Sequence, residues 1–537
     1  PCATLIFYKF LTHKNFFSDI NNFLITNEKN TKEIKKTLLY IFISFLIFII
    51  LEFLSTTFPI NKVDSYHDGQ KLSSAYKFFN EGSLWSGSYV TVGIFYETLS
   101  SSLLWKLFNH VSIGLARFAE VFYIFVFKCL FIYFIYLITK SSELELKKKI
   151  IFFIFNSIIF ISLIDYDLPS VDSLSYREIP ILILLILFFF LLSKQKNIIY
   201  ILFISILSPA SMFWGVDRGL ICNILIFIIL IFLIFSKRKN ESLQLFLLTC
   251  SSWYFSFLYL GEEFNYFLNN TYLVYKEMPY VHGLIHPKIF SDDPNASRAT
   301  KTIILILMNL LISINLFFKK NYSNNFSKLI IFLSIISAGS YLYALGRSDG
   351  PHIKNSFGFP LMTISLFFSY LILKNFFKDF SLNKYNLLIG TFFILFILNL
   401  NMNFKNILSF DKRFNNYIYL SDKYFLNDKE RQFIDFIKPK LKNVKCIQLF
   451  SNDAILNYIL RKNSCTKYYF VWSAASKLNQ KRFIKELSNS NIIIAGGEKN
   501  EWDYPLEVKI EDVYSYILKN YELKESFNNW EVFVKKY

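Results

Sequence analysis

Four short segments combine carboxylates with arginine, lysine or histidine in a chain that is otherwise strongly apolar. They are the segments 63–70, 165–180, 214–219 and 346–354, and each lies at the end of a long apolar run. An ionisable side chain at the edge of a hydrocarbon layer is costly unless it is paired, solvated or used. Arginine binds phosphate oxygens through two parallel hydrogen bonds, and a nearby carboxylate can take a proton from an attacking hydroxyl. The combination suits transfer of a group from a lipid phosphate to an acceptor.

The charged residues of these segments are the candidate site residues. Asp64, His67 and Asp68 lie in the first segment. The others are, in chain order, Asp167, Arg177, Glu178, Asp217, Arg218, Arg347, Asp349, His352 and Lys354. If the apolar runs cross a membrane, all four segments fall on one side of it and can converge when the helices bundle. We therefore expect a charged cavity at that face of the membrane.

A single acidic–basic pair at a helix end is usually structural, and this alternative applies to each segment alone. Arg117 and Glu120, three positions apart in a predicted helix, are expected to form such a structural pair. His67 is expected to be a hydrogen-bonding neighbour rather than a metal ligand. No cysteine or histidine spacing indicates a structural zinc site.

Composition identifies the setting of these segments. Of the 537 residues, 53% are hydrophobic and only 18% are charged, against about 25% charged in soluble proteins. This excludes a disordered chain and a single soluble domain. The formal net charge of +18 would suggest nucleic acid in a soluble protein, but basic cytoplasmic loops of a membrane protein account for it. We expect a polytopic α-helical membrane protein with no nucleic-acid partner.

Eleven apolar runs are long enough to be candidate membrane helices. The predicted spans are 37–58, 115–138, 150–164, 179–193, 198–213, 220–236, 243–260, 302–318, 329–345, 357–373 and 386–400. The long fourth outer loop, between 260 and 302, carries Glu262, Glu263, Asp292 and Asp293, for which simple solvation is the alternative to a role in the site.

The basic clusters set the orientation. They fall at every second loop, as the positive-inside rule requires of cytoplasmic loops. We predict a cytoplasmic segment 1–36 with no cleavable signal peptide, a transmembrane domain 37–403 with a long first outer loop 59–114, and an extracytoplasmic domain 404–537. The expected location is the bacterial inner (cytoplasmic) membrane.

The domain 404–537 alternates strand-like and helix-like runs, which predicts a small α/β domain. The strands are expected at 446–450, 467–472 and 491–495, and the helices at 452–460, 475–487 and 511–521. Cys446 and Cys465 are either a disulfide or two unrelated thiols. The domain lacks a Gly-rich phosphate loop, so we expect it to cap the cavity or help select the acceptor.

These residues resemble the GT-C superfamily of glycosyltransferases that use polyprenyl-phosphate sugars, which includes the protein O-mannosyltransferases and the lipid A aminoarabinose transferases. In that family, an acidic motif in the first outer loop precedes a short helix and a glycine. Here His67-Asp68, the helix-like stretch 72–79 and Gly82 occupy those places. The segments around Arg177, Arg218 and Arg347 and the C-terminal domain also resemble those of bacterial members. A histidine precedes Asp68 where many members have a second carboxylate, so a divalent metal is possible but its ligands are unknown.

The resemblance implies an inverting transfer of a hexosyl or pentosyl group at the outer face of the membrane. The donor would be a polyprenyl-phosphate-linked sugar, the acceptor a glycan, lipid or protein, with membrane lipid around the chain. Asp68 would be the base, with Asp64 as its rival, and Arg177, Arg218, Arg347, His352 and Lys354 would hold the leaving phosphate. The alternatives are a transporter or flippase, or a polymerase or ligase, for lipid-linked sugars.

Overall fold

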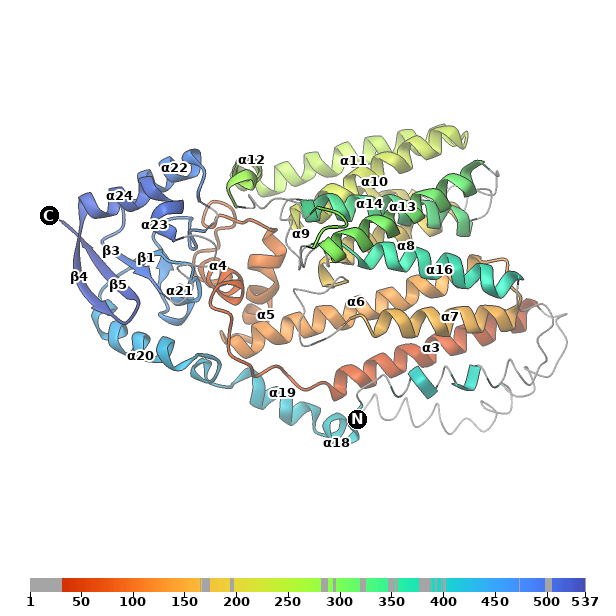
Figure 1. The fold of residues 1–537 in the computed structure, drawn as a ribbon, viewed down its shortest axis with the longest axis horizontal. Coiled ribbons are helices and arrows are strands. Elements are labelled where there is room, and N and C mark those ends of the chain that lie inside the picture. The colour runs from red at the N-terminus through yellow and green to blue at the C-terminus, as the bar shows by residue number, and fades with distance from the viewer. Residues whose placement is uncertain are drawn as a thin grey trace.

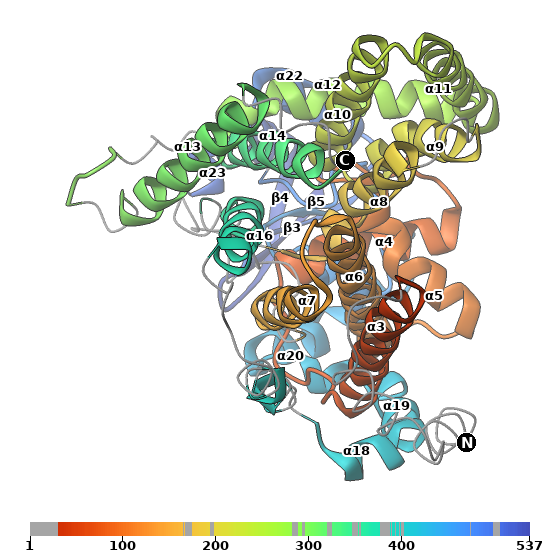
Figure 2. The same ribbon diagram turned by 90° about the vertical axis from the view of Figure 1, so that its right-hand side faces the viewer.

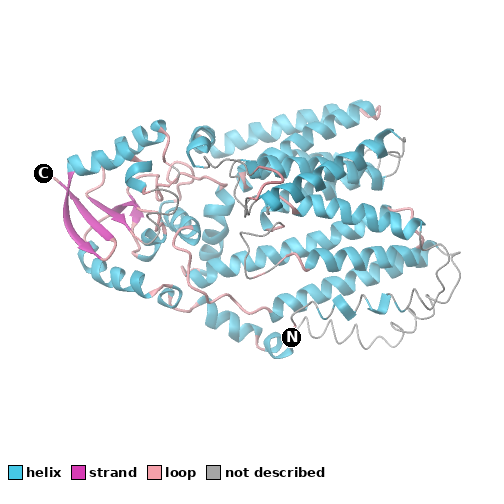
Figure 3. Cartoon of the chain, viewed as in Figure 1, coloured by secondary structure: helices cyan, strands magenta, loops and turns pink. Residues whose placement is uncertain are grey.

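The computed structural model describes residues 31–164, 166, 174–193, 198–281, 288–292, 296–318, 325–345, 353, 356–375, 387, 389–391, 394–396, 398, 402–472, 474–497 and 505–536. A bundle of long helices fills one end of the molecule and a small sheet lies at the other (Figures 1 and 3). Short helices of the first loop lie between them (Figure 1).

The bundle helices coincide with the predicted spans. In chain order they are α3 (Thr31–Ser55), α6 (Ile113–Ser141), α7 (Leu146–Ile161), α8 (Ile179–Ser193), α9 (Ile198–Trp214), α10 (Val216–Phe235), α11 (Lys239–Leu260), α13 (Ala296–Phe318), α14 (Asn325–Leu345) and α16 (Gly358–Asn375). Six of these described helices are long and apolar enough to cross a membrane. Of the eleventh predicted span, 386–400, residues 387, 389–391, 394–396 and 398 are described and are helical, and the others lie outside the described residues. The chain is a multi-pass membrane protein.

The distribution of apolar side chains explains the positions of α8 and α11 in the bundle. α8 is apolar around its whole circumference, and it packs against α6, α9 and α10. α11 lies at the edge of the bundle seen end-on (Figure 2), and Phe246, Tyr254 and Phe255 on it are exposed. An apolar surface of this kind is the surface that a lipid bilayer covers.

The first outer loop contains the helices α4 (His67–Glu81) and α5 (Ser100–Phe108), joined through a π-helical turn, η1 (Phe95–Leu99). The expected helix at 72–79 is the middle of α4. α4 packs against the C-terminal domain. A methyl group on Gly69 would collide with the backbone nitrogen of Ile455, so only glycine allows this close approach. Ser73 Oγ donates to Ala454 O at 2.5 Å.

The fourth outer loop is not a simple loop, because it contains the helix α12 (Glu262–Val281). Asn270 on α12 pairs with both backbone groups of Val90, accepting from its N–H at 3.1 Å and donating to its carbonyl at 2.6 Å. Glu277, also on α12, is buried and accepts hydrogen bonds from the backbone of Ala475 and Ser476. α12 therefore joins the first loop to the C-terminal domain.

The C-terminal domain is a five-stranded mixed sheet flanked by helices, with strand order β2-β1-β3-β5-β4. β1 pairs in parallel with β2 and β3, while β5 pairs antiparallel with β3 and β4. Its elements are α18 (Phe404–Leu408), α19 (Phe410–Ile418), η4 (Asp422–Phe425), α20 (Asp428–Ile437), η5 (Lys438–Leu441), β1 (Cys446–Phe450), α21 (Ile455–Ile459), β2 (Asn463–Ser464), α22 (Lys477–Leu487), β3 (Ile492–Gly496), α23 (Leu506–Lys509), α24 (Glu511–Asn520), β4 (Tyr521–Phe527) and β5 (Trp530–Lys535).

One predicted strand is wrong. Residues 467–472 form no strand, because the position beside β1 is taken by the short β2. Tyr468, Tyr469 and Trp472 are buried in contacts outside the sheet instead. The hairpin β4–β5 was not expected from the sequence, and it turns at Asn528 with a positive φ of 51°.

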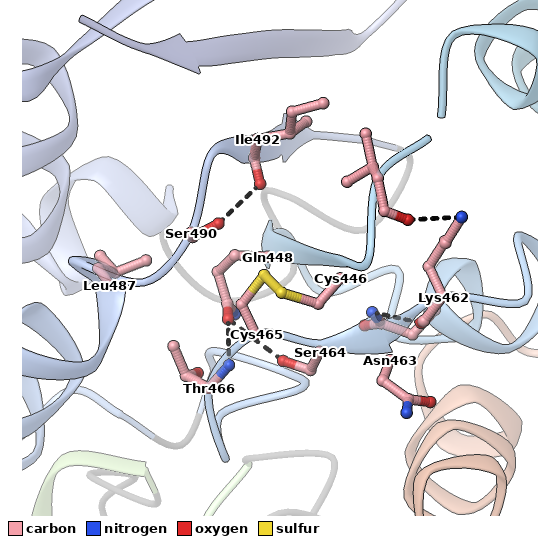
Figure 4. Close-up of a disulfide and its surroundings, with 12 residues drawn as sticks. Cys446, Gln448, Lys462, Asn463, Ser464, Cys465, Thr466, Leu487, Ser490 and Ile492 are labelled. Carbon is pink, nitrogen blue, oxygen red and sulfur yellow. Dashed lines mark hydrogen bonds between the residues drawn. A yellow bond between two sulfur atoms is a disulfide. The ribbon is translucent and has the colours of Figure 1, made fainter. Parts of the chain in front are cut away.

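A disulfide joins Cys446 on β1 to Cys465, immediately after β2 (Figure 4). Of the two alternatives from the sequence, the structure therefore has the disulfide. It fixes the start of the sheet next to the residues that follow β2. Two residues at this place, Ser464 and Thr466, present carbonyls to the buried Lys77 of α4 at 3.1 and 3.0 Å.

Removing this disulfide is predicted to destabilise the protein. The bond closes a loop with a sequence separation of 19, for which loop-closure entropy gives about 3 kcal/mol. The double substitution C446S/C465S should lower the Tm of the detergent-solubilised protein, whereas C250S, at a free exposed cysteine of α11, should leave it unchanged. A reductant should lower the Tm of the wild type and of C250S, which keep the disulfide, but not that of C446S/C465S. A wild-type Tm insensitive to reductant would contradict the prediction.

Candidate functional site

The acidic motif of the first loop forms the beginning of α4. Asp64 Oδ1 accepts hydrogen bonds from the backbone N–H groups of Tyr66 and His67 at 3.0 and 3.3 Å. Asp64 Oδ2 lies 2.8 Å from His67 Nδ1. These contacts hold the turn that precedes α4, whose N-cap position is Tyr66. Asp64 therefore has a local structural role that Asp68, one position inside the helix from His67, does not share.

Asp68 faces α6 and binds Arg117. Its Oδ2 accepts from Arg117 Nη2 and from the Asp64 backbone, both at 3.0 Å. Arg117 also donates to the carbonyl of Asn61 at 2.7 Å. Asp68 Oδ1 has no hydrogen-bond partner among the described residues, and the side chain is 21% exposed. One carboxylate oxygen is thus fixed, and the other is open.

The expected pairing of Arg117 with Glu120 is wrong, because each pairs with α4 instead. Glu120 forms a buried ion pair with Lys71, one helical turn beyond Asp68. Burial is the largest single influence on the pKa of Lys71 and lowers it, but Glu120 together with Tyr176, Tyr96 and Asp68 outweighs burial and holds the pKa well above its usual value. Lys71 is therefore a permanent cation in the site.

The aromatic ring of Tyr96 connects this pair to the next cluster. Lys71 Nζ lies 4.6 Å and Arg177 Cζ 5.2 Å from the centre of that ring. Both distances are within the range of cation–π attraction. The second expected segment is thereby brought next to the first.

The second and third expected segments meet directly. Residues 176–178 form a short 3-10 turn, η2 (Tyr176–Glu178), before α8. Arg177 Nη2 donates to Asp217 Oδ2 at 2.8 Å, and Arg218 binds Glu178 through Nε and Nη2 at 2.9 and 2.7 Å. Arg218 also contacts Asp217. The four residues form one ion-pair network between η2 and α10.

Together these pairs form what we call the polar layer, at the end of the bundle where α6, α8 and α10 begin. Its members are Asp68, Lys71, Arg117, Glu120, Arg177, Glu178, Asp217 and Arg218. The layer holds four carboxylates and four cations and is therefore balanced in charge. The expected members Asp167, Arg347, Asp349, His352 and Lys354 lie outside the described residues.

Two buried donors next to the layer have no partner among the described residues. They are Tyr176 Oη, on η2, and Trp214 Nε1, at the end of α9. Both rings pack around Tyr123, at centroid distances of 5.8 and 6.3 Å. A buried unpaired donor is costly in an isolated fold, and such donors suit the recognition of a ligand oxygen.

Glu97, on the turn η1, ties the layer to the rest of the protein. Its side chain is fully buried and accepts from Thr91 N and Oγ1, from Val92 N and from Tyr469 Oη, the last at 2.7 Å. Burial raises the pKa of the Glu97 carboxyl above its usual 4.5, and the hydrogen bond from Tyr469 lowers it in part. Glu97 thus links the first loop to the C-terminal domain, one residue from Tyr96.

Sequence reasoning missed Lys71 and Glu97 and misread Arg117 and Glu120. Glu97 carries a signal: it is the only ionisable residue apart from tyrosine between Glu81 and Lys106, and an isolated charge in an apolar run indicates a specific partner. Lys71 carries none, because a lysine in an amphipathic helix looks solvated.

Within the described residues, no group of three or more histidine, cysteine, aspartate or glutamate side chains is placed to hold a metal ion. His67 contacts Asp64, as a hydrogen-bonding neighbour would. Asp68 binds the Asp64 backbone and Arg117 through its Oδ2.

No protein-family model and no curated protein matches the chain. Solved structures similar to it include ArnT from Cupriavidus metallidurans bound to undecaprenyl phosphate. That match has 10% identity and a TM-score of 0.46 and covers 92% of this chain and 97% of that one. Another is the Archaeoglobus fulgidus oligosaccharyltransferase in complex with Zn and sulfate, with 13% identity, a TM-score of 0.46, and 91% and 72% covered. Both TM-scores are below 0.5, so the function of this chain has to be inferred from its own residues and contacts.

The raised pKa of Glu97 predicts a pH-dependent stability. The folded state binds the proton more tightly than the unfolded state, so stability falls as pH rises from 4.5 toward the raised pKa. The E97Q side chain does not titrate, so this variant lacks the pH-dependent loss of stability. Its amide oxygen can accept from Thr91 and Val92, and its amide nitrogen can donate to Tyr469 Oη. The Tm of E97Q minus that of the wild type should therefore grow with pH above 4.5.

Y469F provides the control for this prediction. It removes a hydrogen bond that lowers the pKa of Glu97, so it should steepen the fall in Tm. Thermal unfolding in detergent across this pH range measures both effects. A Tm difference between E97Q and wild type that stays constant with pH would contradict the assignment.

Proposed function

We propose that the chain is an inverting glycosyltransferase of the GT-C type. It would move a sugar from a polyprenyl phosphate to a glycan, lipid or protein acceptor at the outer face of the inner membrane. The observation that carries the proposal is Asp68, a carboxylate with one oxygen fixed by Arg117 and the other open, within a layer of ion pairs at the end of a membrane bundle.

In the proposed reaction, the open Oδ1 of Asp68 receives the proton of the acceptor hydroxyl. The acceptor oxygen forms a bond to the anomeric carbon from the face opposite the phosphate. The bond between that carbon and the phosphate oxygen breaks, and its electron pair leaves with the polyprenyl phosphate. Arg117 keeps Asp68 oriented during the transfer. A positioned base of this kind contributes about 10²–10⁴-fold.

The leaving phosphate gains negative charge during transfer, and the described polar layer has no excess positive charge to match it. We propose that Tyr176 Oη and Trp214 Nε1 donate to the phosphate oxygens beside Arg177 and Arg218. The cluster of Arg347, Asp349, His352 and Lys354 is proposed to supply the remaining positive charge. Asp167 and Glu178 are proposed to orient the arginines.

The proposed orientation has two supports. Basic residues cluster in alternate loops, which places the N-terminus in the cytoplasm. The Cys446–Cys465 disulfide favours an oxidising compartment for the C-terminal domain. Both support the proposed position of the polar layer on the outer side, where lipid-linked sugars would meet an acceptor.

Replacing the proposed base is predicted to stop the reaction. D68N should reduce transfer by about 10²–10⁴-fold, because an amide cannot take the proton. Release of free polyprenyl phosphate is measured with purified protein in membranes that contain a panel of polyprenyl-phosphate sugars, with and without EDTA to test for a metal.

D64N is the matched control and should retain transfer, because Asp64 accepts hydrogen bonds in the turn before α4 and is not the proposed base. Equal release by the wild type and D68N would discard Asp68 as the base. If the wild type releases nothing from any donor, the proposal fails for that panel and a lipid-sugar transport assay tests the transporter alternative.

The proposed phosphate donors give a separate prediction. Y176F should lower kcat/KM for the lipid donor about tenfold or more, because a hydrogen bond to a charged group is lost. Its Tm should not fall, since Tyr176 Oη has no partner among the described residues. An unchanged kcat/KM would place the phosphate elsewhere.

A further inference from the structure

A cavity of about 330 Å³ is lined by none of the residues of the polar layer. Four segments meet around it: the junction between α5 and α6, the turn after α19, one face of α20, and the end of α21. α19 and α20 lie along the flank that joins the bundle to the sheet domain (Figure 1). A volume of this size falls at the lower end of the range for small-molecule sites.

The wall of the cavity is rich in cations. It contains Lys423, Arg431, Lys438 and Arg461 but only two carboxylates, Asp422 and Asp435. The described wall therefore has a net charge of +2, in contrast to the balanced polar layer. An excess of fixed cations around a concave surface attracts an anion.

Asp422 is committed to the fold and cannot neutralise the cavity further. Its Oδ1 accepts from the backbone of Ile113, the first residue of α6, at 2.8 Å. Its Oδ2 accepts from Tyr458 Oη and Arg461 Nη2, at 2.9 and 2.8 Å. Arg461 Nη1 has no partner in the described part of the chain, so this arginine is anchored at one nitrogen and unsatisfied at another.

The remaining cations are held weakly or not at all. Lys423 pairs with Asp435 at 3.3 Å, but both side chains are about two-thirds exposed, at 66% and 64%. Arg431 pairs with Asp428, which is 82% exposed, and Arg431 Nε has no partner among the described residues. Exposed ion pairs of this kind contribute little to the stability of the fold. Lys438 Nζ forms no ion pair with any described residue.

One aromatic side chain lies at the edge of this charged surface. Tyr419 is 60% exposed, and its ring lies 4.6 Å from the ring of His110. His110 Nε2 lies 3.1 Å from the carbonyl oxygen of Ile418, so the imidazole is held in place. An exposed ring beside fixed polar groups offers a flat surface for the apolar face of a sugar.

We propose that this cavity binds a phosphate ester, with the phosphate between Arg461, Arg431 and Lys438 and a sugar or glycerol unit against Tyr419. Arginine and lysine bind phosphate by charge-assisted hydrogen bonds. The phosphate belongs to a glycan or to a lipid headgroup. The site does not depend on the proposed transferase activity.

A lipid headgroup is within reach because the cavity lies near the membrane surface. α18 starts beside the end of α3, where Asn403 N donates to Ser55 Oγ at 2.7 Å. Leu408 on α18 is 83% exposed. From there α19 spans nine residues, or about 14 Å, to the turn that forms the cavity wall.

The experiment is isothermal titration calorimetry of the full-length protein in detergent. The three ligands are glucose 1-phosphate, inorganic phosphate and glucose. Glucose 1-phosphate should bind most tightly, phosphate more weakly, and glucose not at all. K438E should weaken both phosphates about tenfold or more, whereas K442E, an equal charge change at an exposed residue outside the cavity, should alter them less than about twofold. Y419A should remove the advantage of glucose 1-phosphate over phosphate.

Nanodiscs distinguish the two sources of phosphate. If phosphatidylglycerol discs weaken glucose 1-phosphate binding relative to phosphatidylcholine discs, a lipid headgroup occupies the cavity. If the two kinds of disc give the same Kd, the phosphate belongs to a soluble or glycan ligand. Absence of saturable phosphate binding to the wild type, equal binding of glucose and glucose 1-phosphate, or equal losses in K438E and K442E would overturn the proposal.

Discussion

Charges buried at the end of an apolar bundle must be matched, and this requirement sets the geometry of the site. Except for Arg218–Asp217 within α10, the ion pairs of the polar layer join different elements: α4 to α6 through Asp68–Arg117 and Lys71–Glu120, and η2 to α10 through Arg177–Asp217 and Glu178–Arg218. Removing one partner of a buried pair costs about 3–5 kcal/mol. A helix that slides by one turn would break these pairs, so the layer fixes the relative heights of the helices that carry it.

The irregular part of the first loop is held by a second set of polar side chains, which replace the hydrogen bonds that secondary structure would supply. Glu263 accepts from the backbone of Leu84 and Ser86 at 3.3 and 3.1 Å, and Asn270 pairs with Val90. Glu97 accepts from the backbone of Thr91 and Val92. Buried backbone groups need such partners. The loop between α4 and η1 is consequently ordered without being a helix or a strand.

Much of this architecture could be predicted from the sequence, because the signals were local. Long apolar runs predict the bundle helices, and charged segments at their ends predict a convergence on one face, where the structure joins Arg177 and Glu178 to Asp217 and Arg218. Two strands of the sheet and the disulfide alternative were also expected.

The failures concern contacts between distant parts of the chain. Spacing suggested that Arg117 pairs with Glu120, but α4 offered both residues better partners. Residues 467–472 are apolar because they fill the interface with the first loop, and sequence alone cannot distinguish this from a buried strand. α12 looked like a polar loop because its carboxylates bind backbone groups far away in the chain.

The contact between α4 and the C-terminal domain has a consequence for the order in which the protein is synthesised and folds. Ser65, Ser73 and Lys77 donate hydrogen bonds to residues that lie 381 to 388 positions further along the chain. Synthesis delivers the loop that carries Asp68 long before it delivers the surface that supports it. A nascent chain whose bundle helices are all inserted still lacks the C-terminal domain that supports this loop. The support of Asp68, the proposed base, is therefore complete only after the last domain has folded and docked, so the finished chain is the first form that can carry the proposed activity.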